Sequence, residues 1–201
     1  IPSDAIILFD GNDFSKWKSI RSDQKVLWTL NIDKSMTVKP GTGGISTRDE
    51  HGSIQLHIEW KTPKIIKGEG QYRGNSGVFF QRRYEVQILD SYNNRTYSNG
   101  QAGSIYLQHV PLVNATLPPD TWQTYDIIFK APVFNENGGV ESPAYITVFH
   151  NGVLIQNNSQ IQGYVKFIGY PEYKAHVSKL PIKLQDHSNL VSFRNIWIRR
   201  L

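Results

Sequence analysis

The sequence predicts an all-β fold in which two antiparallel sheets pack face to face as a jelly-roll β-sandwich. Apolar and polar residues alternate with a period of two in short runs, which is the pattern of strands with one buried face. Clusters of Gly, Asn, Asp and Pro separate these runs, and no blade-length motif repeats as it would in a propeller. Helical periodicity is nearly absent. We therefore expect a sandwich with almost no helix.

The strands can be placed in chain order. Seven runs show clear alternation, at 54–60, 76–81, 84–89, 104–108, 124–129, 144–150 and 191–198, and two weaker runs lie at 26–32 and 181–185. A short helical turn is expected at 15–19. The apolar rows of the clear runs predict a core that includes Ile58, Trp60, Val86, Ile88, Ile127 and Phe129. In the last run either row of side chains could be the buried one.

The connections between strands are also informative. Asn151-Gly152 separates two apolar runs and predicts a tight hairpin turn, because both central positions of such a turn need a positive φ. Long polar loops are expected at 64–74, 132–143 and 164–179, and the last is rich in aromatic residues. Loops of this length in a compact domain are usually functional.

Composition bounds the function. A chain of 201 residues with 39% hydrophobic residues fits one domain spanning 1–201. The absence of cysteine excludes disulfides, thiolate zinc sites and cysteine nucleophiles. The 22 Lys and Arg are scattered among 17 Asp and Glu, whereas a nucleic-acid binder gathers them into a stripe, so we expect no nucleic-acid partner. No apolar run is long enough for a transmembrane helix. The start at Ile1 without a leader suggests a mature chain whose export signal was removed.

Two strand carboxylates are candidates for chemistry. Glu59 and Glu85 both lie in rows opposite the apolar residues of their strands, and Gln87 shares the row of Glu85. Carboxylates and amides on an outer sheet face can bind sugar hydroxyls, and paired carboxylates across a cleft cleave glycosidic bonds. The simpler alternative is a solvated polar face, which is the default for an antiparallel sheet.

Two histidines and an arginine are further candidates. Asp186-His187 follows a predicted strand, so Asp186 could orient the imidazole for acid–base work or join a metal site, unless it only caps its turn. His150 ends a strand at the sheet rim, where a histidine is more often merely exposed. Arg83 precedes Glu85 and could hold it ionised or bind a substrate oxygen, or form only a surface ion pair.

Several segments, taken in order, resemble a known bacterial family. They are LFDG at 8–11, IEW at 58–60, GNSGVF at 74–79, YEVQILDS at 84–91, HNGV at 150–153, PIKLQDH at 181–187 and FRNIW at 193–197. The chain is thereby similar to the 3-keto-disaccharide hydrolase domain family, common in the Bacteroides group and often described as glycosyl hydrolases. One departure is Ser188, where relatives often have glycine.

The resemblance implies a concanavalin-like jelly-roll sandwich, export to the periplasm or cell surface, and cleavage of 3-keto-glycosides or 3-keto-disaccharides by hydrolysis or β-elimination. A ketone at C3 acidifies the C2 hydrogen, so a base can remove it while the aglycone leaves. On this view the catalytic candidates are Glu85, Glu59, His187 and His150. The expected substrate contacts are Arg83, Gln87, Asn75, Gln185 and Asp186. No cofactor is required with certainty, although a divalent cation could replace the donor that stabilises the enolate.

Two other functions fit the same residues. One is a non-catalytic carbohydrate-binding module, since a fold does not fix a function. The other is a conventional retaining or inverting glycosidase that uses Glu59 and Glu85. The sequence indicates neither the separation of these two carboxylates nor the oligomeric state.

Overall fold

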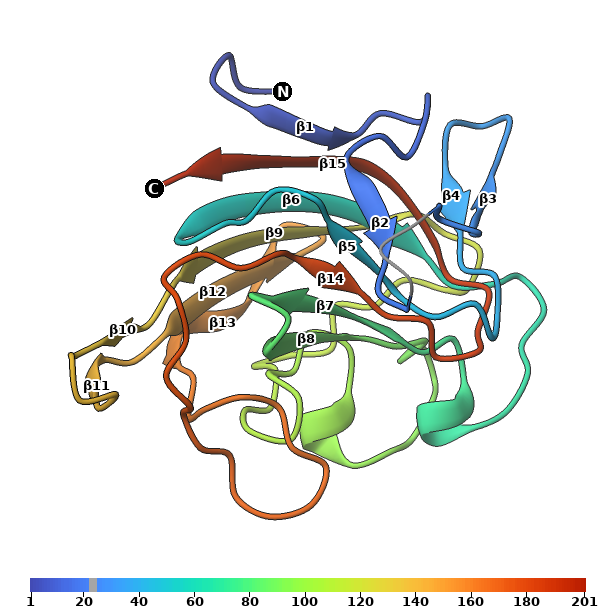
Figure 1. The fold of residues 1–201 in the computed structure, drawn as a ribbon. Helices are drawn as coiled ribbons and strands as arrows, with labels where there is room; N and C mark the ends of the chain where they lie inside the picture. Colours follow the sequence, from blue (N-terminus) through green and yellow to red (C-terminus); the bar gives the residue numbers. More distant parts are fainter. Residues whose placement is uncertain (22–24) are drawn as a thin grey trace.

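Two antiparallel sheets pack face to face in the computed structural model, which describes residues 1–21 and 25–201 (Figure 1). The strands of the larger sheet are β1 (Ile6–Phe9), β3 (Thr29–Leu30), β4 (Met36–Thr37), β6 (Ile54–Lys61), β9 (Gln123–Lys130), β12 (Tyr145–His150), β13 (Val153–Gln160) and β15 (Ser192–Arg200). Their order is β13, β12, β9, β6, β15, β4, β3, and β1 pairs with β15.

The smaller sheet carries the features that concern function. Its strands are β2 (Trp17–Ser19), β5 (Ile45–Thr47), β7 (Ser76–Phe80), β8 (Tyr84–Ile88) and β14 (Lys183–Leu184), in the order β2, β5, β14, β7, β8. A separate two-stranded ribbon joins β10 (Val133–Phe134) to β11 (Val140–Ser142). The predicted sandwich of two antiparallel sheets is confirmed.

The core lies between the two sheets and follows from the alternation. In β6 every second side chain, from Ile54 to Trp60, is buried while those between are partly exposed. The six residues predicted as core are all buried. Phe80 of the small sheet stacks on Phe129 of the large one, with ring centroids 4.7 Å apart, so aromatic contacts join the layers directly.

A β-bulge explains why the last strand gives no clean alternation. The register between β15 and β6 shifts between Arg194 and Trp197, where Asn195 has a φ of +46°. An extra residue at this point reverses which row faces inward. Phe193 is buried before the bulge, and Ile196 and Ile198 are buried after it. One row of side chains is therefore buried before the bulge, and the other row is buried after it.

Several expected elements differ from the structure. Residues 104–108 form no strand, because the backbone turns back on itself and makes only isolated bridges, from Ile105 to Val86 and to His109. The expected helical turn at 15–19 is a turn at 15–16 followed by β2. The weak runs at 26–32 and 181–185 contain only the short strands β3 and β14.

The tight turn at Asn151-Gly152 is confirmed. The two residues have φ values of +53° and +77°, as the turn between β12 and β13 requires. Helical structure in the described residues is limited to two single turns of 3-10 helix, η1 (Gly70–Tyr72) and η2 (Ser98–Gly100). Within the same residues, no helix is long and apolar enough to cross a membrane.

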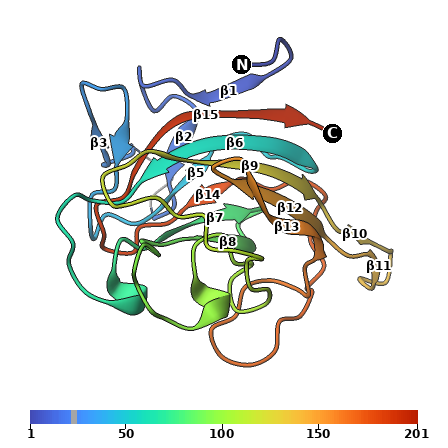
Figure 2. The ribbon, with the colours of Figure 1, turned by 180° about the vertical axis from the view of Figure 1, so that it is seen from behind.

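Two of the three expected long loops, at 64–74 and 164–179, lie on one side of the sandwich, whereas 132–143 forms the separate β10–β11 ribbon. Figures 1 and 2, which view the molecule from opposite sides, both show η1, η2 and the loop before β14 beyond β7 and β8. The outer face of the small sheet is thus covered by loops over these strands.

Candidate active site

Strand pairing places three functional side chains side by side on the outer face of the small sheet. Lys183 of β14 pairs with Phe79 of β7, and Phe79 pairs with Glu85 of β8. Their neighbours along each strand, such as Val78 and Val86, are buried in the core, so this row points away from it. The Lys183 ammonium lies 3.6 Å from the centre of the Phe79 ring, a cation–π contact.

Gly77 makes room for the Glu85 carboxylate. A Cβ added at Gly77 would clash with Oε1 of Glu85, so the carboxylate occupies the space that a side chain at position 77 would fill. The backbone of Gly77 has no positive φ. Glycine is therefore needed here for the close approach rather than for its backbone freedom.

The environment of Glu85 favours its protonated form. Its side chain is almost fully covered, with the residue only 5% exposed. No side chain or backbone group among residues 1–21 and 25–201 forms a hydrogen bond with its carboxylate. Burial raises the pKa of Glu85 from 4.5 to about 8, and the positive charge of Lys183 opposes part of that rise. A carboxyl group that titrates near neutral pH can act as an acid or as a base.

A cavity of about 360 Å³ opens above this row. Its floor is the sheet, and loop residues form its walls. It is lined by Asn75, Phe79, Glu85, Gln87, Tyr106, Val165, Phe167, Lys183, Gln185 and His187. Charged, amide, phenolic and imidazole groups thus converge on one space, as in a site for a polar small molecule.

The amides of the floor are held by hydrogen bonds. Nε2 of Gln87 donates to Oε1 of Gln71 at 2.9 Å and to the Gly100 carbonyl at 3.1 Å. Nδ2 of Asn75 donates to the Gln71 carbonyl at 2.7 Å. Oε1 of Gln185 is buried and has no partner among the described residues. It is an acceptor that a ligand can satisfy.

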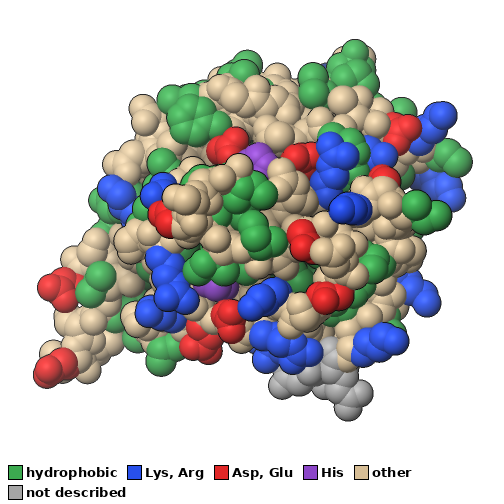
Figure 3. Space-filling view, turned by 90° about the horizontal axis from the view of Figure 1, so that it is seen from above, with side chains coloured by type: hydrophobic (Ala, Val, Ile, Leu, Met, Phe, Trp, Pro, Cys, Tyr) green, Lys and Arg blue, Asp and Glu red, His purple; other side chains and the backbone are tan. Residues whose placement is uncertain are grey.

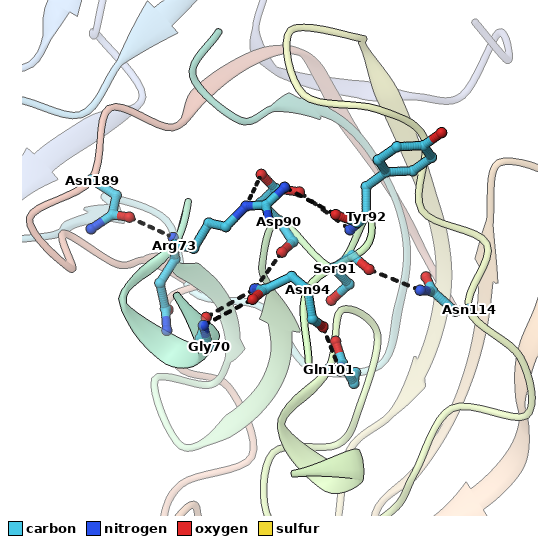
Figure 4. A network of polar contacts seen from close by, with 10 residues as sticks. Gly70, Arg73, Asp90, Ser91, Tyr92, Asn94, Gln101, Asn114 and Asn189 are labelled. Atoms are coloured by element: carbon cyan, nitrogen blue, oxygen red, sulfur yellow. Dashed lines mark hydrogen bonds and ion pairs between the residues drawn. The ribbon is translucent and has the colours of Figure 1, made fainter. Parts of the chain in front are cut away.

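A second polar network connects the segment before β7 to the segment after β8 (Figure 4). Nε of Arg73 forms an ion pair with Oδ2 of Asp90 at 2.7 Å, and both side chains are largely buried. Asn94 accepts from the Gly70 amide at 2.8 Å and donates to the Asp90 carbonyl at 2.7 Å. These bonds tie η1 and the residues after it to the segment after β8.

Five residues predicted from the sequence line this one cavity, namely Glu85, Gln87, Asn75, Gln185 and His187. Asp186 lies beside it and fixes a turn instead, because its carboxylate accepts from the backbone amides of Gly43 and Ser188 at 2.9 Å each. Ser188 has a φ of +62°, a conformation in which glycine has no steric cost.

Arg83 is not among the lining residues. Its backbone carbonyl accepts a hydrogen bond from the amide of Val165 at 2.8 Å and so holds the loop that carries Val165 and Phe167. The structure gives its side chain no contact with the cavity.

The structure does not bring Glu59 to Glu85. Glu59 is on the outer face of the other sheet, where it accepts from Arg194 at 2.6 Å and from Asn195 at 2.9 Å. Burial alone would raise the pKa of Glu59, but these two partners outweigh it and lower that pKa. Two packed sheets, about 10 Å apart, lie between the carboxylates, so the expected pair across a cleft is not formed.

His150 is likewise distant from the cavity, and it is not exposed at the sheet rim. It is 1% exposed and packs against the rings of Trp60 and Tyr125. Its Nε2 lies 2.8 Å from Oε1 of Gln123. Burial lowers the pKa of His150 to about 3, so its imidazole is neutral at physiological pH.

The outer face of the large sheet carries its own polar cluster. Nδ1 of His57 lies 2.7 Å from Asp126, and Nε2 lies 3.9 Å from Glu59. Figure 3 shows purple, red and blue side chains meeting on the face seen from above. In residues 1–21 and 25–201 no three His, Asp or Glu side chains are grouped so that they could hold a metal ion.

Sequence reasoning missed Lys183, Phe79, Tyr106, Val165 and Phe167. The alternation could have revealed Lys183, because it shares an outward row with Gln185. No local pattern marks the other wall residues, since only the folding of distant loops brings Tyr106 and Phe167 over Glu85.

Solved structures with similar folds include two candidate glycosyl hydrolases from Parabacteroides distasonis ATCC 8503. One is 49% identical with a TM-score of 0.96, and the match covers 100% of this chain and 85% of that one. The other is 21% identical with a TM-score of 0.69, covering 98% and 94%. The alginate lyase Aly36B, at 10% identity and a TM-score of 0.51, covers 98% and 97%. The last two likenesses show the fold alone.

A search of the curated proteins finds no match. A family model, by contrast, matches residues 4–199, nearly the whole chain. The similarity to the first Parabacteroides structure extends over the same residues and includes the strands that form the cavity floor. The chain belongs to the family of 3-keto-alpha-glucoside-1,2-lyase-like domains.

Proposed function

We propose that this protein cleaves the glycosidic bond of 3-keto-glycosides by β-elimination, with Glu85 as the base that removes the C2 proton. The observation that carries the proposal is the Glu85 carboxyl group, which is buried in a polar cavity and free of hydrogen bonds from the described residues. Its raised pKa makes it a stronger base than an exposed carboxylate once it is ionised. The family to which the chain belongs supports the same reaction class.

The chemistry of the substrate explains why one well-placed base can suffice. The C3 ketone acidifies the C2 hydrogen, and Glu85 takes that proton. The electron pair left at C2 forms the C1=C2 double bond while the C1–O bond breaks, and its electrons leave with the aglycone oxygen. Addition of water across C1=C2 then gives the free 3-keto sugar. The net result of the two steps is hydrolysis of the glycosidic bond.

Two side chains complement the base. The Lys183 ammonium lies in the same row as Glu85, where a positive charge can stabilise the enolate oxygen that develops as the proton leaves. His187 lines the cavity wall and is exposed, so its imidazole can deliver a proton to the departing oxygen. Asn75, Gln87 and Gln185 supply amide groups to the sugar hydroxyls.

A pair of substrates tests the proposal. Purified protein is incubated with a nitrophenyl 3-keto-glucoside and with the unoxidised nitrophenyl glucoside, and released nitrophenol is measured. We expect cleavage of the keto compound only, with the unsaturated C1=C2 sugar detectable by mass spectrometry at early times. Cleavage of both compounds would indicate a conventional glycosidase. Binding without release from either would indicate a carbohydrate-binding module.

A further inference from the structure

A second cavity of about 600 Å³ adjoins the one above Glu85. The two share Tyr106, Phe167 and His187 as common walls. Beyond these walls, the second cavity is lined by Tyr72, Tyr97, Glu69 and Arg95, among others. A ligand that extends from the first cavity past the shared residues therefore enters the second.

We propose that this second cavity binds the leaving group of the substrate and selects aglycones that contain a flat ring with an apolar face. The inference rests on the proposed function, because it treats the cavity above Glu85 as the site of the sugar that reacts. The scissile bond then lies at the shared walls, beside His187. An aryl ring and a pyranose ring both present the chemistry required.

Uncovered aromatic side chains are the first support. Tyr72 is 78% exposed and Phe167 is 76% exposed, so both rings are available to a ligand. Tyr97 is also exposed, and its hydroxyl lies 2.6 Å from that of Tyr106. Aromatic rings bury large areas and favour stacked partners, which explains a preference for rings over small alkyl groups.

Unpaired charges are the second support. Neither Glu69 nor Arg95 forms an ion pair or a side-chain hydrogen bond with any described residue. Both are exposed at the wall of the cavity. Glu69 can accept hydrogen bonds from hydroxyl groups at the edge of a ligand ring, and Arg95 can donate hydrogen bonds to them, while the face of that ring stacks on a tyrosine.

The walls are also held in place before a ligand arrives. Nε2 of Gln71 donates to the Gly100 carbonyl at 2.9 Å and to Oγ1 of Thr96 at 3.2 Å. These bonds connect η1, which carries Tyr72, to the segment that carries Tyr97. A preorganised pocket loses less entropy when it binds a rigid ring.

Equilibrium binding tests this proposal without requiring turnover. Isothermal titration compares methyl, phenyl and glucosyl glucosides, which share the unoxidised sugar and differ in the aglycone. We expect the phenyl or glucosyl compound to bind the wild type at least ~10-fold more tightly than the methyl compound, since one well-placed aromatic contact is worth that much. Tyr72→Ala and Tyr97→Ala should each reduce this gain in affinity over the methyl compound.

The matched control is Tyr92→Ala, because Tyr92 is a partly exposed tyrosine that lines neither cavity. It should keep the full gain, and melting curves check that all three variants are folded. Equal affinity for the three glucosides, or a gain that persists in both cavity variants, would overturn the proposal. If the gain is present but no 3-keto-glucoside is cleaved, the proposed reaction fails while the ring-binding cavity stands.

Discussion

Glu85 and Glu59 are both glutamates on strands, yet their surroundings shift their pKa values in opposite directions. Burial without hydrogen bonds raises the pKa of Glu85, whereas the hydrogen bonds from Asn195 and Arg194 lower that of Glu59 despite its burial. The partners of Glu59 are separated from it by 135 and 136 residues in the chain. Local sequence therefore gives no means of telling the two apart.

Replacement of the base tests the residue at the centre of the proposal. We expect Glu85→Gln to lower kcat on a nitrophenyl 3-keto-glucoside by ~100-fold or more, because the amide keeps the shape but accepts no proton. The melting temperature at pH 5, where Glu85 in the folded wild type is uncharged like the amide, should change little. The matched control, Glu59→Gln, should keep kcat within a few-fold. A folded Glu85→Gln variant with normal kcat and a raised KM would assign Glu85 to binding alone.

The raised pKa of Glu85 also predicts how stability depends on pH. Between pH 4.5 and about 8 the unfolded chain has released this proton while the folded protein retains it. Since the folded state binds more protons in this range, this group makes stability fall as pH rises, by up to about 1.4 kcal/mol per pH unit. Glu85→Gln removes the effect. The difference in unfolding free energy, variant minus wild type, should therefore increase from pH 5 to pH 8, and an invariant difference would contradict it.

β7 and β8 position the Glu85 carboxylate through the missing side chain of Gly77. Gly77→Ala places a methyl group where Oε1 of Glu85 lies, so the carboxylate must move. We expect kcat to fall ~10-fold or more with a modest change in melting temperature, because misplacement of a catalytic group is costly. Gly52→Ala is the control, since its added Cβ would meet only ordinary contacts at 3.5 Å and beyond. Full activity in Gly77→Ala would show that the position of this carboxylate is not critical.

The loop around η1 depends on the Arg73–Asp90 ion pair. Arg73→Met leaves the Asp90 carboxylate buried without its cation, which typically costs about 3–5 kcal/mol. Adding Asp90→Asn to the Arg73→Met variant should recover part of the lost stability, because the buried carboxylate charge is then removed. Arg199→Met, which breaks the exposed pair with Asp4, should cost much less stability, because an ion pair in solvent contributes little. Chemical denaturation of the four proteins measures these differences, and similar losses for both arginines would contradict the argument.

Period-two alternation was sufficient to predict most long strands but not the irregular elements. It places β6, β9 and β12 closely, since one face of each packs into the core. It fails at 104–108, where Ile105 is buried from a turn in which Leu107 has a φ of +60°. Burial of apolar residues does not require a strand, and the sequence does not distinguish the two cases.

The candidate site was predictable where it lies on strands and not where it lies on loops. Glu85 and Gln87 follow from alternation and Gln185 was expected from the family resemblance, and the three share a cavity. Tyr106, Val165 and Phe167 come from loops whose paths depend on hydrogen bonds such as that from Val165 to Arg83. The assignment of Glu59 and Glu85 to one cleft was wrong, because alternation tells which residues face outward but not from which sheet.

For the whole molecule, the two outer sheet faces have different surroundings. Loops cover β7 and β8 and enclose the cavity, while charged and polar side chains cover β6 and β15 on the opposite face. The core between them is shared, so the position of Glu85 depends on the packing of both sheets.

The place of β15 determines when this chain can fold. β15 is the last of the described strands in chain order, yet it pairs with β6, β4 and β1 and so lies inside the large sheet. Deletion of residues 192–201 should therefore abolish cooperative unfolding rather than trim an edge, and near-UV circular dichroism would detect the loss of packed aromatic residues. A native-like spectrum would refute this.

The same arrangement sets an order of events during synthesis. Of the described strands, β1 is made first and its partner β15 last, and long-range pairing of this kind forms slowly. Until then β6 exposes an unpaired edge that another chain could occupy. The partly made large sheet is thus open to misassociation from the time β6 has been made until β15 pairs with it.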